Sequence, residues 1–198
     1  MAKRIVPENC LGAIIDVQEF FLSQVGRRNC SKIKVNIKNF IRLLSYFKIP
    51  IVLTLERPVE QKGIVPAEIG DHTGDLIETF EKSFFDLTKE KKIRDGIGRR
   101  RRRQIVVAGC ETDVCVLQSC LGLLGLGYEV YVVQELVFSS SRNVDSAITR
   151  MQAEGATLMT YKTLYYELIE AVEGSRHTEK MLERFGPFPD DLPDFAVQ

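Results

Sequence analysis

The stretch that decides the fold is IVVAGCETDVCVLQ, residues 105–118. It opens with four apolar residues, breaks at Gly109, and passes through Glu-Thr-Asp into apolar residues at helical spacing, namely Val114, Leu117, Leu121 and Leu124. This order is typical of a buried strand, a tight turn and a helix with its start signal. We expect Cys115 in the first turn of that helix, where unpaired N–H groups and the helix dipole favour a thiolate. Cys115 is therefore a candidate nucleophile.

The alternation of strand and helix continues on both sides of this stretch. Short apolar runs predict strands at residues 10–17, 51–55, 127–133 and 156–160, and residues 76–85 predict an extended segment. Apolar residues at helical spacing predict helices over 35–47, 143–153 and 164–172, with a weaker pattern over 88–97. Residues 56–74 have no clear period and predict a loop with a helical turn near Pro66. Repeated strand–helix–strand units indicate an α/β fold, with a parallel sheet covered by helices on both faces.

Length and composition limit the classes of protein that fit. A chain of 198 residues fits one domain, which we expect over residues 1–173, followed by a polar, proline-rich tail over 174–198 that packs on a neighbouring subunit or frays. The formal net charge is zero, which argues against nucleic acid or a membrane as partner. Five cysteines without a Cys-x-x-Cys pair argue against a disulfide framework or a zinc site. No signal-like segment follows Met1, so we expect a cytoplasmic protein.

Two further residues lie where Cys115 could use them. Asp16 ends the first predicted strand, and open α/β sheets bind ligands at the carboxyl ends of their strands. Lys82 lies on the extended segment over 76–85. A cysteine that attacks a carbonyl needs a base, a cation and donors for the oxyanion. Asp16 can accept the thiol proton, Lys82 can lower the pKa of the thiol, and N–H groups at the helix start can bind the oxyanion.

Each of these residues also has an ordinary explanation. An Asp at a strand end is usually a turn residue, a Lys in a Phe-rich segment usually lies on the surface, and a helical Cys usually belongs to the core. The basic run Arg99 to Arg103 could suggest nucleic-acid binding, but it has no interleaved aromatic residues. We interpret this run as a solvated helix end or as a salt-bridge patch between subunits.

Three segments in order resemble the isochorismatase-like cysteine hydrolases, the family of nicotinamidases and N-carbamoylsarcosine amidases. Residues 13–21, AIIDVQEFF, are similar to the family's strand with Asp-x-Gln-x-x-Phe. Residues 80–85, FEKSFF, are similar to its Lys-x-x-Phe segment, and residues 107–116, VAGCETDVCV, to its Gly-x-x-Thr-Asp-x-Cys-Val turn. The similarity extends over about residues 10 to 170, so it covers most of the chain.

The resemblance implies a three-layer α/β/α, Rossmann-like fold with a mostly parallel six-stranded sheet, and a homo-oligomer. It implies a catalytic triad of Asp16, Lys82 and Cys115. It also implies a cis peptide bond between Cys110 and Glu111, which would turn backbone N–H groups toward the site as an oxyanion hole. For the substrate we expect a small, partly aromatic pocket formed by Gln18, Phe20, Phe21 and Phe85.

Two departures from the family pattern narrow the chemistry. Nicotinamidases carry an Asp-x-His metal site after the second strand, whereas residues 54–61 are TLERPVEQ and contain no histidine. We therefore expect no catalytic metal, no cofactor and no nicotinamidase activity. Isochorismatases that cleave a vinyl ether lack the cysteine, so Cys115 favours hydrolysis of a small amide or ester through an acyl-enzyme. The alternatives are a non-catalytic oligomeric scaffold or metabolite-binding protein with the same fold and, less favoured, a vinyl-ether hydrolase.

Overall fold

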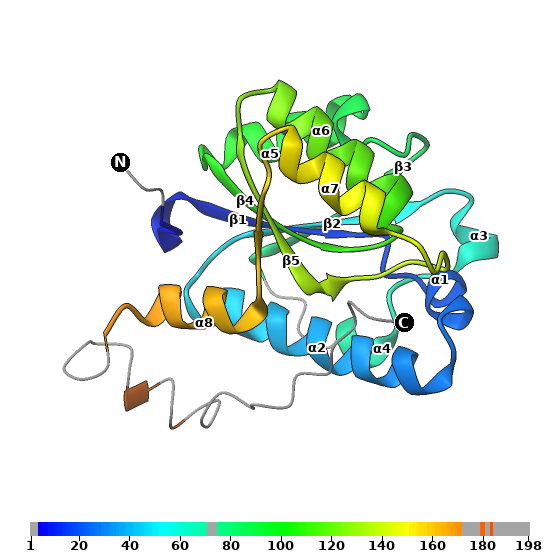
Figure 1. Cartoon of the computed structure of the whole chain (residues 1–198), viewed down its shortest axis with the longest axis horizontal. Helices are drawn as coiled ribbons and strands as arrows, with labels where there is room; N and C mark the ends of the chain where they lie inside the picture. The colour runs from blue at the N-terminus through cyan, green and yellow to red at the C-terminus, as the bar shows by residue number, and fades with distance from the viewer. Residues whose placement is uncertain (1–3, 71–74, 172–178, 181–182, 184–198) are drawn as a thin grey trace.

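The computed structural model describes residues 4–70, 75–171, 179–180 and 183. Six strands form one sheet in the spatial order β3-β2-β1-β4-β5-β6, and all neighbouring strands pair in parallel (Figure 1). The strands are β1 Cys10–Ile15, β2 Ile51–Glu56, β3 Ile77–Lys82, β4 Gln104–Gly109, β5 Glu129–Val137 and β6 Thr157–Met159. The predicted α/β fold with a six-stranded parallel sheet is confirmed. The predicted tail over 174–198 falls almost wholly outside the described residues.

The helices agree with the sequence pattern in their order and differ mainly in where they begin. They are α1 Glu19–Gln24, α2 Arg27–Tyr46, α3 Val59–Lys62, α4 Ala67–Gly70, α5 Lys91–Arg99, α6 Leu117–Gly125, α7 Asp145–Ala153 and α8 Tyr161–Ile169. Helix α2 begins eight residues before the predicted position 35, because its polar first turns still place Ile33 in the core. Helix α8 begins three residues early, because the Thr160 side chain caps it by accepting from the Thr163 N–H. The short helix α1 was not predicted.

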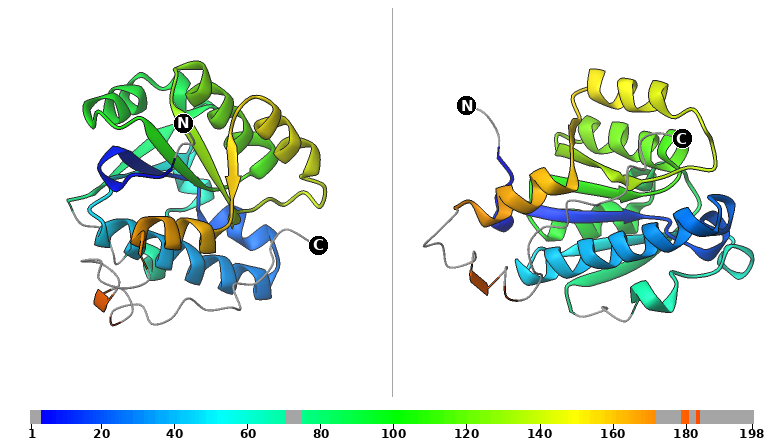
Figure 2. Two further views of the ribbon diagram at one scale, coloured as in Figure 1. Left: turned by 60° about the vertical axis from the view of Figure 1, so that its left-hand side comes forward. Right: turned by 60° about the horizontal axis from the view of Figure 1, so that its bottom comes forward.

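The sheet is the middle of three layers. Helices α2 and α8 cover one face, and α5, α6 and α7 cover the other, as the two turned views in Figure 2 also show. The buried side chains divide in the same way, with Phe40 and Leu164 in one core and Ile93, Cys120 and Met151 in the other. Strands β1, β2 and β4 are buried throughout, which explains why their sequences are continuous apolar runs rather than alternating ones.

Gly12 lets helix α2 lie close to the sheet. A Cβ added at this position of β1 would lie 2.4 Å from Leu44 Cδ1 and 3.4 Å from Ile51 Cγ1. We expect Gly12→Ala to lower the free energy of unfolding by about 1–3 kcal/mol, because overpacking displaces the Leu44 side chain. Urea unfolding measures this loss, and Gly125→Ala is the control, because its Cβ would meet nothing within 4 Å. An additional Leu44→Val change should recover part of the loss. If the double variant loses as much free energy of unfolding as the two single variants added together, overpacking against Leu44 is not the cause.

The outer strand β3 carries charged side chains that are paired within the chain. Arg99 and Arg100, at the end of α5, each place a guanidinium nitrogen 3.0 Å from the Glu78 carboxylate. Arg57 pairs with Glu81 at 2.9 Å. The basic run therefore serves, at least at its first two residues, as an ion-pair patch inside the subunit rather than between subunits. Apart from Arg100, the side chains of these pairs are well exposed, so the contribution of the pairs to stability is small.

None of the helices in the described part of the chain combines the length and apolar character needed to cross a membrane.

Candidate active site

Four side chains meet at the carboxyl edge of the sheet, close to the point where the strand order reverses. The chain runs outward from β1 through β2 to β3, then returns to place β4 on the other side of β1. Asp16 follows β1, Glu56 ends β2, Lys82 ends β3, and Cys115 follows β4. Such a reversal leaves a crevice at the carboxyl ends of the two central strands, where open α/β sheets bind ligands. The topology therefore brings together the three predicted residues and one that was not predicted, Glu56.

Backbone hydrogen bonds continue past the strands and fix the spacing of these ends. The Asp16 N–H donates to the Thr54 carbonyl at 3.1 Å, and the Cys110 N–H donates to the Ile15 carbonyl at 2.8 Å. The Arg57 N–H donates to the Lys82 carbonyl at 3.0 Å. Because these hydrogen bonds continue beyond the strands, the side chains at the strand ends are held by hydrogen-bonded backbone rather than by loose loops.

The turn before Cys115 depends on a close approach of two backbones. Gly109 has a φ of 117°, and a Cβ there would lie 2.0 Å from the Ile15 carbonyl oxygen, so only glycine fits. The peptide bond Cys110–Glu111 is cis, at the position that the resemblance gives. The chain then enters a short π-helix, η3 Thr112–Val116, which contains Cys115 and continues into α6. π-Helical turns are rare and are found frequently at functional sites.

The segment after β5 forms hydrogen bonds with this turn. The Thr112 N–H donates to the Phe138 carbonyl at 3.0 Å, and the Ser140 hydroxyl donates to the Glu111 carboxylate at 3.0 Å. The Ser139 hydroxyl donates to Asp113 at 2.6 Å. Among the described residues, the N–H of Glu111 itself has no hydrogen-bond acceptor. This N–H is a free donor four residues before the thiol.

Asp16 and Lys82 form a fully buried ion pair. Lys82 Nζ lies 2.6 Å from Asp16 Oδ2, and both side chains have no exposed surface. The other oxygen, Asp16 Oδ1, accepts a hydrogen bond from the Thr54 hydroxyl at 2.7 Å. Burial raises the pKa of Asp16 above its ordinary value, against the opposing effect of Lys82. Burial disfavours the Lys82 ammonium, yet the Asp16 and Glu56 carboxylates beside it raise its pKa. Lys82 is therefore the fixed cation of the site.

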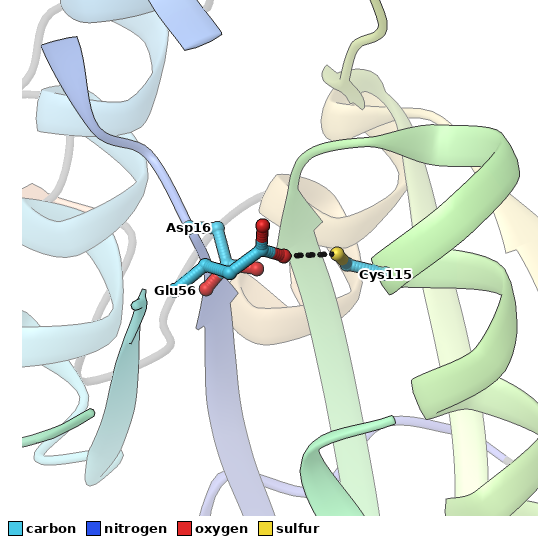
Figure 3. Close-up of side chains that lie close together, drawn as sticks. All are labelled: Asp16, Glu56 and Cys115. Carbon is cyan, nitrogen blue, oxygen red and sulfur yellow. Dashed lines mark hydrogen bonds between the residues drawn. The ribbon is translucent and has the colours of Figure 1, made fainter. Parts of the chain in front are cut away.

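Glu56 is the residue that the sequence reasoning missed. The Cys115 thiol donates to Glu56 Oε2 at 3.0 Å (Figure 3), and Lys82 Nζ lies 3.4 Å from the same oxygen. The other oxygen, Oε1, accepts from the Lys62 ammonium. Burial raises the pKa of Glu56, but the thiol hydrogen bond and the two lysines outweigh burial and lower it below its ordinary value. An acid at the end of an apolar strand was the signal that identified Asp16, and it applies equally to Glu56.

The surroundings of Cys115 oppose the thiolate expected from the helix start, because the thiol is buried and donates a hydrogen bond to Glu56 Oε2. Burial raises the pKa of Cys115 strongly, and the Asp16 and Glu56 carboxylates raise it further. Lys82 lowers it, but by less. The side chain is only 1% exposed. A resting thiol that donates to a carboxylate needs a base at the moment of attack.

The four predicted pocket residues have different surroundings. Gln18 is fully buried: its amide oxygen accepts from the Glu56 N–H at 2.7 Å, and its amide nitrogen donates to the Glu56 and Gly63 carbonyls. Gln18 thus holds the Glu56 backbone in place. Phe21 is buried, with Lys62 Nζ 5.8 Å from its ring centroid. Phe20 and Phe85 are about half exposed.

A metal ion does not fit this cluster. Donor atoms of Asp16, Glu56 and Cys115 lie within 4.8 Å of one another, the only such group among the residues described here. However, the Lys82 ammonium lies against both carboxylates, so a divalent cation would be placed beside a buried positive charge. The thiol proton is also already hydrogen-bonded to Glu56. The charge balance that a metal would supply comes from Lys82.

Comparison with known proteins finds the same domain in other organisms. The model of the isochorismatase domain matches residues 13–163. Isochorismatase family protein 1B of Dictyostelium discoideum is 30% identical over 177 residues, which cover 83% of this chain and 81% of that protein. The MAR1 ribonuclease of Caenorhabditis elegans has a similar fold, with a TM-score of 0.86 at 23% identity over 99% of this chain and 97% of that one. The YcaC gene product of Escherichia coli is described as an octameric hydrolase of unknown specificity. It gives a TM-score of 0.80 at 24% identity, and the match covers 86% of this chain and 84% of that one.

Proposed function

Because the chain belongs to the isochorismatase domain family, whose members are hydrolases, we propose that it is a cysteine hydrolase that cleaves a small amide or ester at Cys115. One observation carries this proposal: at the carboxyl edge of the sheet a thiol contacts one carboxylate, and a buried ammonium contacts that carboxylate and a second one. Burying these charges is costly, and a scaffold or a simple binding protein has no need of such a cluster. The cluster has the groups that attack on a carbonyl requires.

The reaction has two halves. The Cys115 sulfur attacks the substrate carbonyl while a neighbouring carboxylate takes the thiol proton. The oxyanion lies against the N–H groups of Glu111 and Cys115, where fixed donors stabilise developing charge. The Lys82 ammonium balances the carboxylates, and Asp16 holds Lys82 in place. The amine or alcohol leaves, and water then hydrolyses the thioester. Since Cys115 is nearly buried, the acyl group must be small.

The same proposal includes assembly of the chain with copies of itself. The YcaC protein of similar fold is an octamer by its own description. In this chain, Phe20 and Phe85 leave about half of their surface exposed, and a neighbouring subunit would bury such apolar area. Light scattering coupled to size-exclusion chromatography measures the assembly directly.

A trapped acyl-enzyme tests the chemistry. A panel of small amides, carbamoyl compounds and esters is screened for hydrolysis, and the reaction of each active compound is stopped with acid. We expect mass spectrometry to find the acyl group on the peptide that contains Cys115. Hydrolysis without an adduct, or with an adduct on Cys110 or Cys120 instead, would contradict the mechanism. Binding of panel compounds without any hydrolysis would favour the metabolite-binding alternative.

A further inference from the structure

We propose that Thr54 is the positioning residue of the base: its hydroxyl holds one oxygen of the Asp16 carboxylate and leaves the other, Oδ2, to accept the Cys115 proton. This inference rests on the proposed function. Thr54 lies on β2, in the sequence IVLTLE, where every other residue before Glu56 is apolar. It has no exposed surface, and a buried hydroxyl without a hydrogen-bond partner is costly. Asp16 supplies that partner.

Two hydrogen bonds join Thr54 to Asp16. The Asp16 N–H donates to the Thr54 carbonyl at 3.1 Å, and the Thr54 hydroxyl donates to Asp16 Oδ1 at 2.7 Å. Asp16 has a φ of 51°, in the left-handed region that residues other than glycine rarely adopt. Such a backbone persists only where its surroundings hold it. Thr54 therefore fixes the backbone and the side chain of Asp16 together.

The second oxygen of Asp16 is left for the reaction. Oδ2 lies 2.6 Å from Lys82 Nζ, but it is buried and has no hydrogen-bond partner in the part of the chain that the structure describes. A carboxylate oxygen has two lone pairs, so Oδ2 can take a proton while it stays beside the ammonium. Donor atoms of Asp16 and Cys115 lie within 4.8 Å of each other. The resting thiol donates to Glu56, and catalytic hydrogen bonds often shorten only when substrate binds.

The proton of the thiol moves through Oδ2. As the S–C bond forms, the S–H bond breaks, the proton goes to Asp16 and the carbonyl electron pair goes to oxygen. As the tetrahedral intermediate collapses, the C–N or C–O bond breaks and the proton goes to the leaving nitrogen or oxygen. Water then attacks the thioester and gives a proton to Asp16, the S–C bond breaks, and the sulfur takes that proton back. Thr54 transfers no proton and acts through Asp16.

The charge on Asp16 depends on its neighbours. The titratable groups that face it are Glu56 from β2, Lys82 from β3, Cys110 from the turn after β4 and Cys115 from η3. Burial raises the pKa of Asp16, whereas Lys82 and the Thr54 hydroxyl lower it. The hydroxyl lowers the pKa because it donates to the carboxylate and so stabilises the charged form. Without this hydroxyl, Asp16 would stay protonated to a higher pH.

Thr54→Val tests the role, because valine keeps the shape of threonine and removes the hydroxyl. The kcat/KM for 4-nitrophenyl acetate is measured against pH, and its acid limb reports the base of the free enzyme. We expect this limb to move up by about one pH unit, the size of effect that a hydrogen bond to a charged group produces. The rate at higher pH should change much less. Thr54→Ser retains the hydroxyl and should leave the limb in its original place.

A second measurement does not depend on turnover. In protein labelled with carbon-13 at the aspartate carboxyl groups, the resonance of Asp16 is identified by its loss in Asp16→Asn. Its titration gives the pKa of Asp16, which Thr54→Val should raise by about one unit. Thr88→Val is the matched control, because the buried Thr88 hydroxyl donates to the Asp86 carboxylate at 2.6 Å outside the cluster. We expect this control to lower stability and to leave both the limb and the Asp16 titration unchanged.

The outcomes distinguish the two proposals. If Thr54→Val lowers the rate by the same factor at every pH, Thr54 is merely structural and the inference is wrong. A shift of the Asp16 titration without a shift of the limb, or an equal shift of the limb in Thr88→Val, would also overturn it. If Thr54→Val does not fold, Thr54→Ala takes its place. If the ester never acylates Cys115 in the unaltered protein, the proposed function fails, and the carbon-13 titration still decides whether Thr54 controls Asp16.

Discussion

Replacing Cys115 with alanine is expected to lower turnover of any active substrate by roughly 10,000-fold, because the variant loses the atom that forms the acyl-enzyme. Neither carboxylate can replace the sulfur, since both lie in ion pairs with Lys82. The measurement is the rate of product release with the best compound of the panel. Circular dichroism and urea unfolding establish that the variant is folded.

Cys120→Ala is the matched control for this experiment. Cys120 is equally buried and lies on α6, the helix that follows the η3 turn. Its side chain packs in the core. We expect this change to cost about 1 kcal/mol of stability and to leave turnover within a few-fold of the original rate. Turnover that persists in the Cys115→Ala variant would mean that another group is the nucleophile.

The second large effect concerns stability. We expect Lys82→Met to lower the free energy of unfolding by about 3–5 kcal/mol, because it leaves buried carboxylates without their cation. Lys82 and Asp16 have no exposed surface, so water cannot take over the role of the ammonium. Urea unfolding at pH 7 measures the loss. Lys91→Met, which removes an exposed ion pair with Asp95, should change stability by less than about 0.5 kcal/mol.

A double variant identifies the cause of this loss. Asp16→Asn combined with Lys82→Met removes both charges of the closest pair, and we expect it to be less destabilised than the sum of the two single changes. If the double variant instead loses as much stability as the two single variants added together, Lys82 contributes through packing alone. Because the ammonium also contacts Glu56, the double variant should remain less stable than the original chain.

The fold was predictable from the sequence because its signals are local. Strands β1, β2 and β4 are apolar throughout since both faces of the sheet are covered, and this pattern is visible in a linear sequence. Helix boundaries were less accurate where polar residues begin a helix, as at Arg27, or where a cap such as Thr160 defines the first turn. The short helices α1, α3 and α4 have too few residues to give a period.

The site was predictable in position but not in electrostatics. Asp16, Lys82 and Cys115 were identified and do lie together. Glu56 was assigned to a loop because the predicted strand ended at Leu55, one residue too early. The thiolate was predicted from the helix dipole, which acts within one turn. The pKa of Cys115 depends instead on burial and on two carboxylates from other strands, which no local pattern of Cys115 contains.

The ion pairs along β3 have a consequence for how far the sheet can grow. Each of the two outer strands of an open sheet has one side without a paired strand. Such an exposed edge can add a strand from another molecule. Strand β3 carries Glu78 and Glu81, each held by arginine, and strand β6 at the other edge is only three residues long. A charged edge and a very short one both discourage strand addition and amyloid-like aggregation. Copies of this chain should therefore meet through helices and loops, and the sheet should stop at six strands in any assembly.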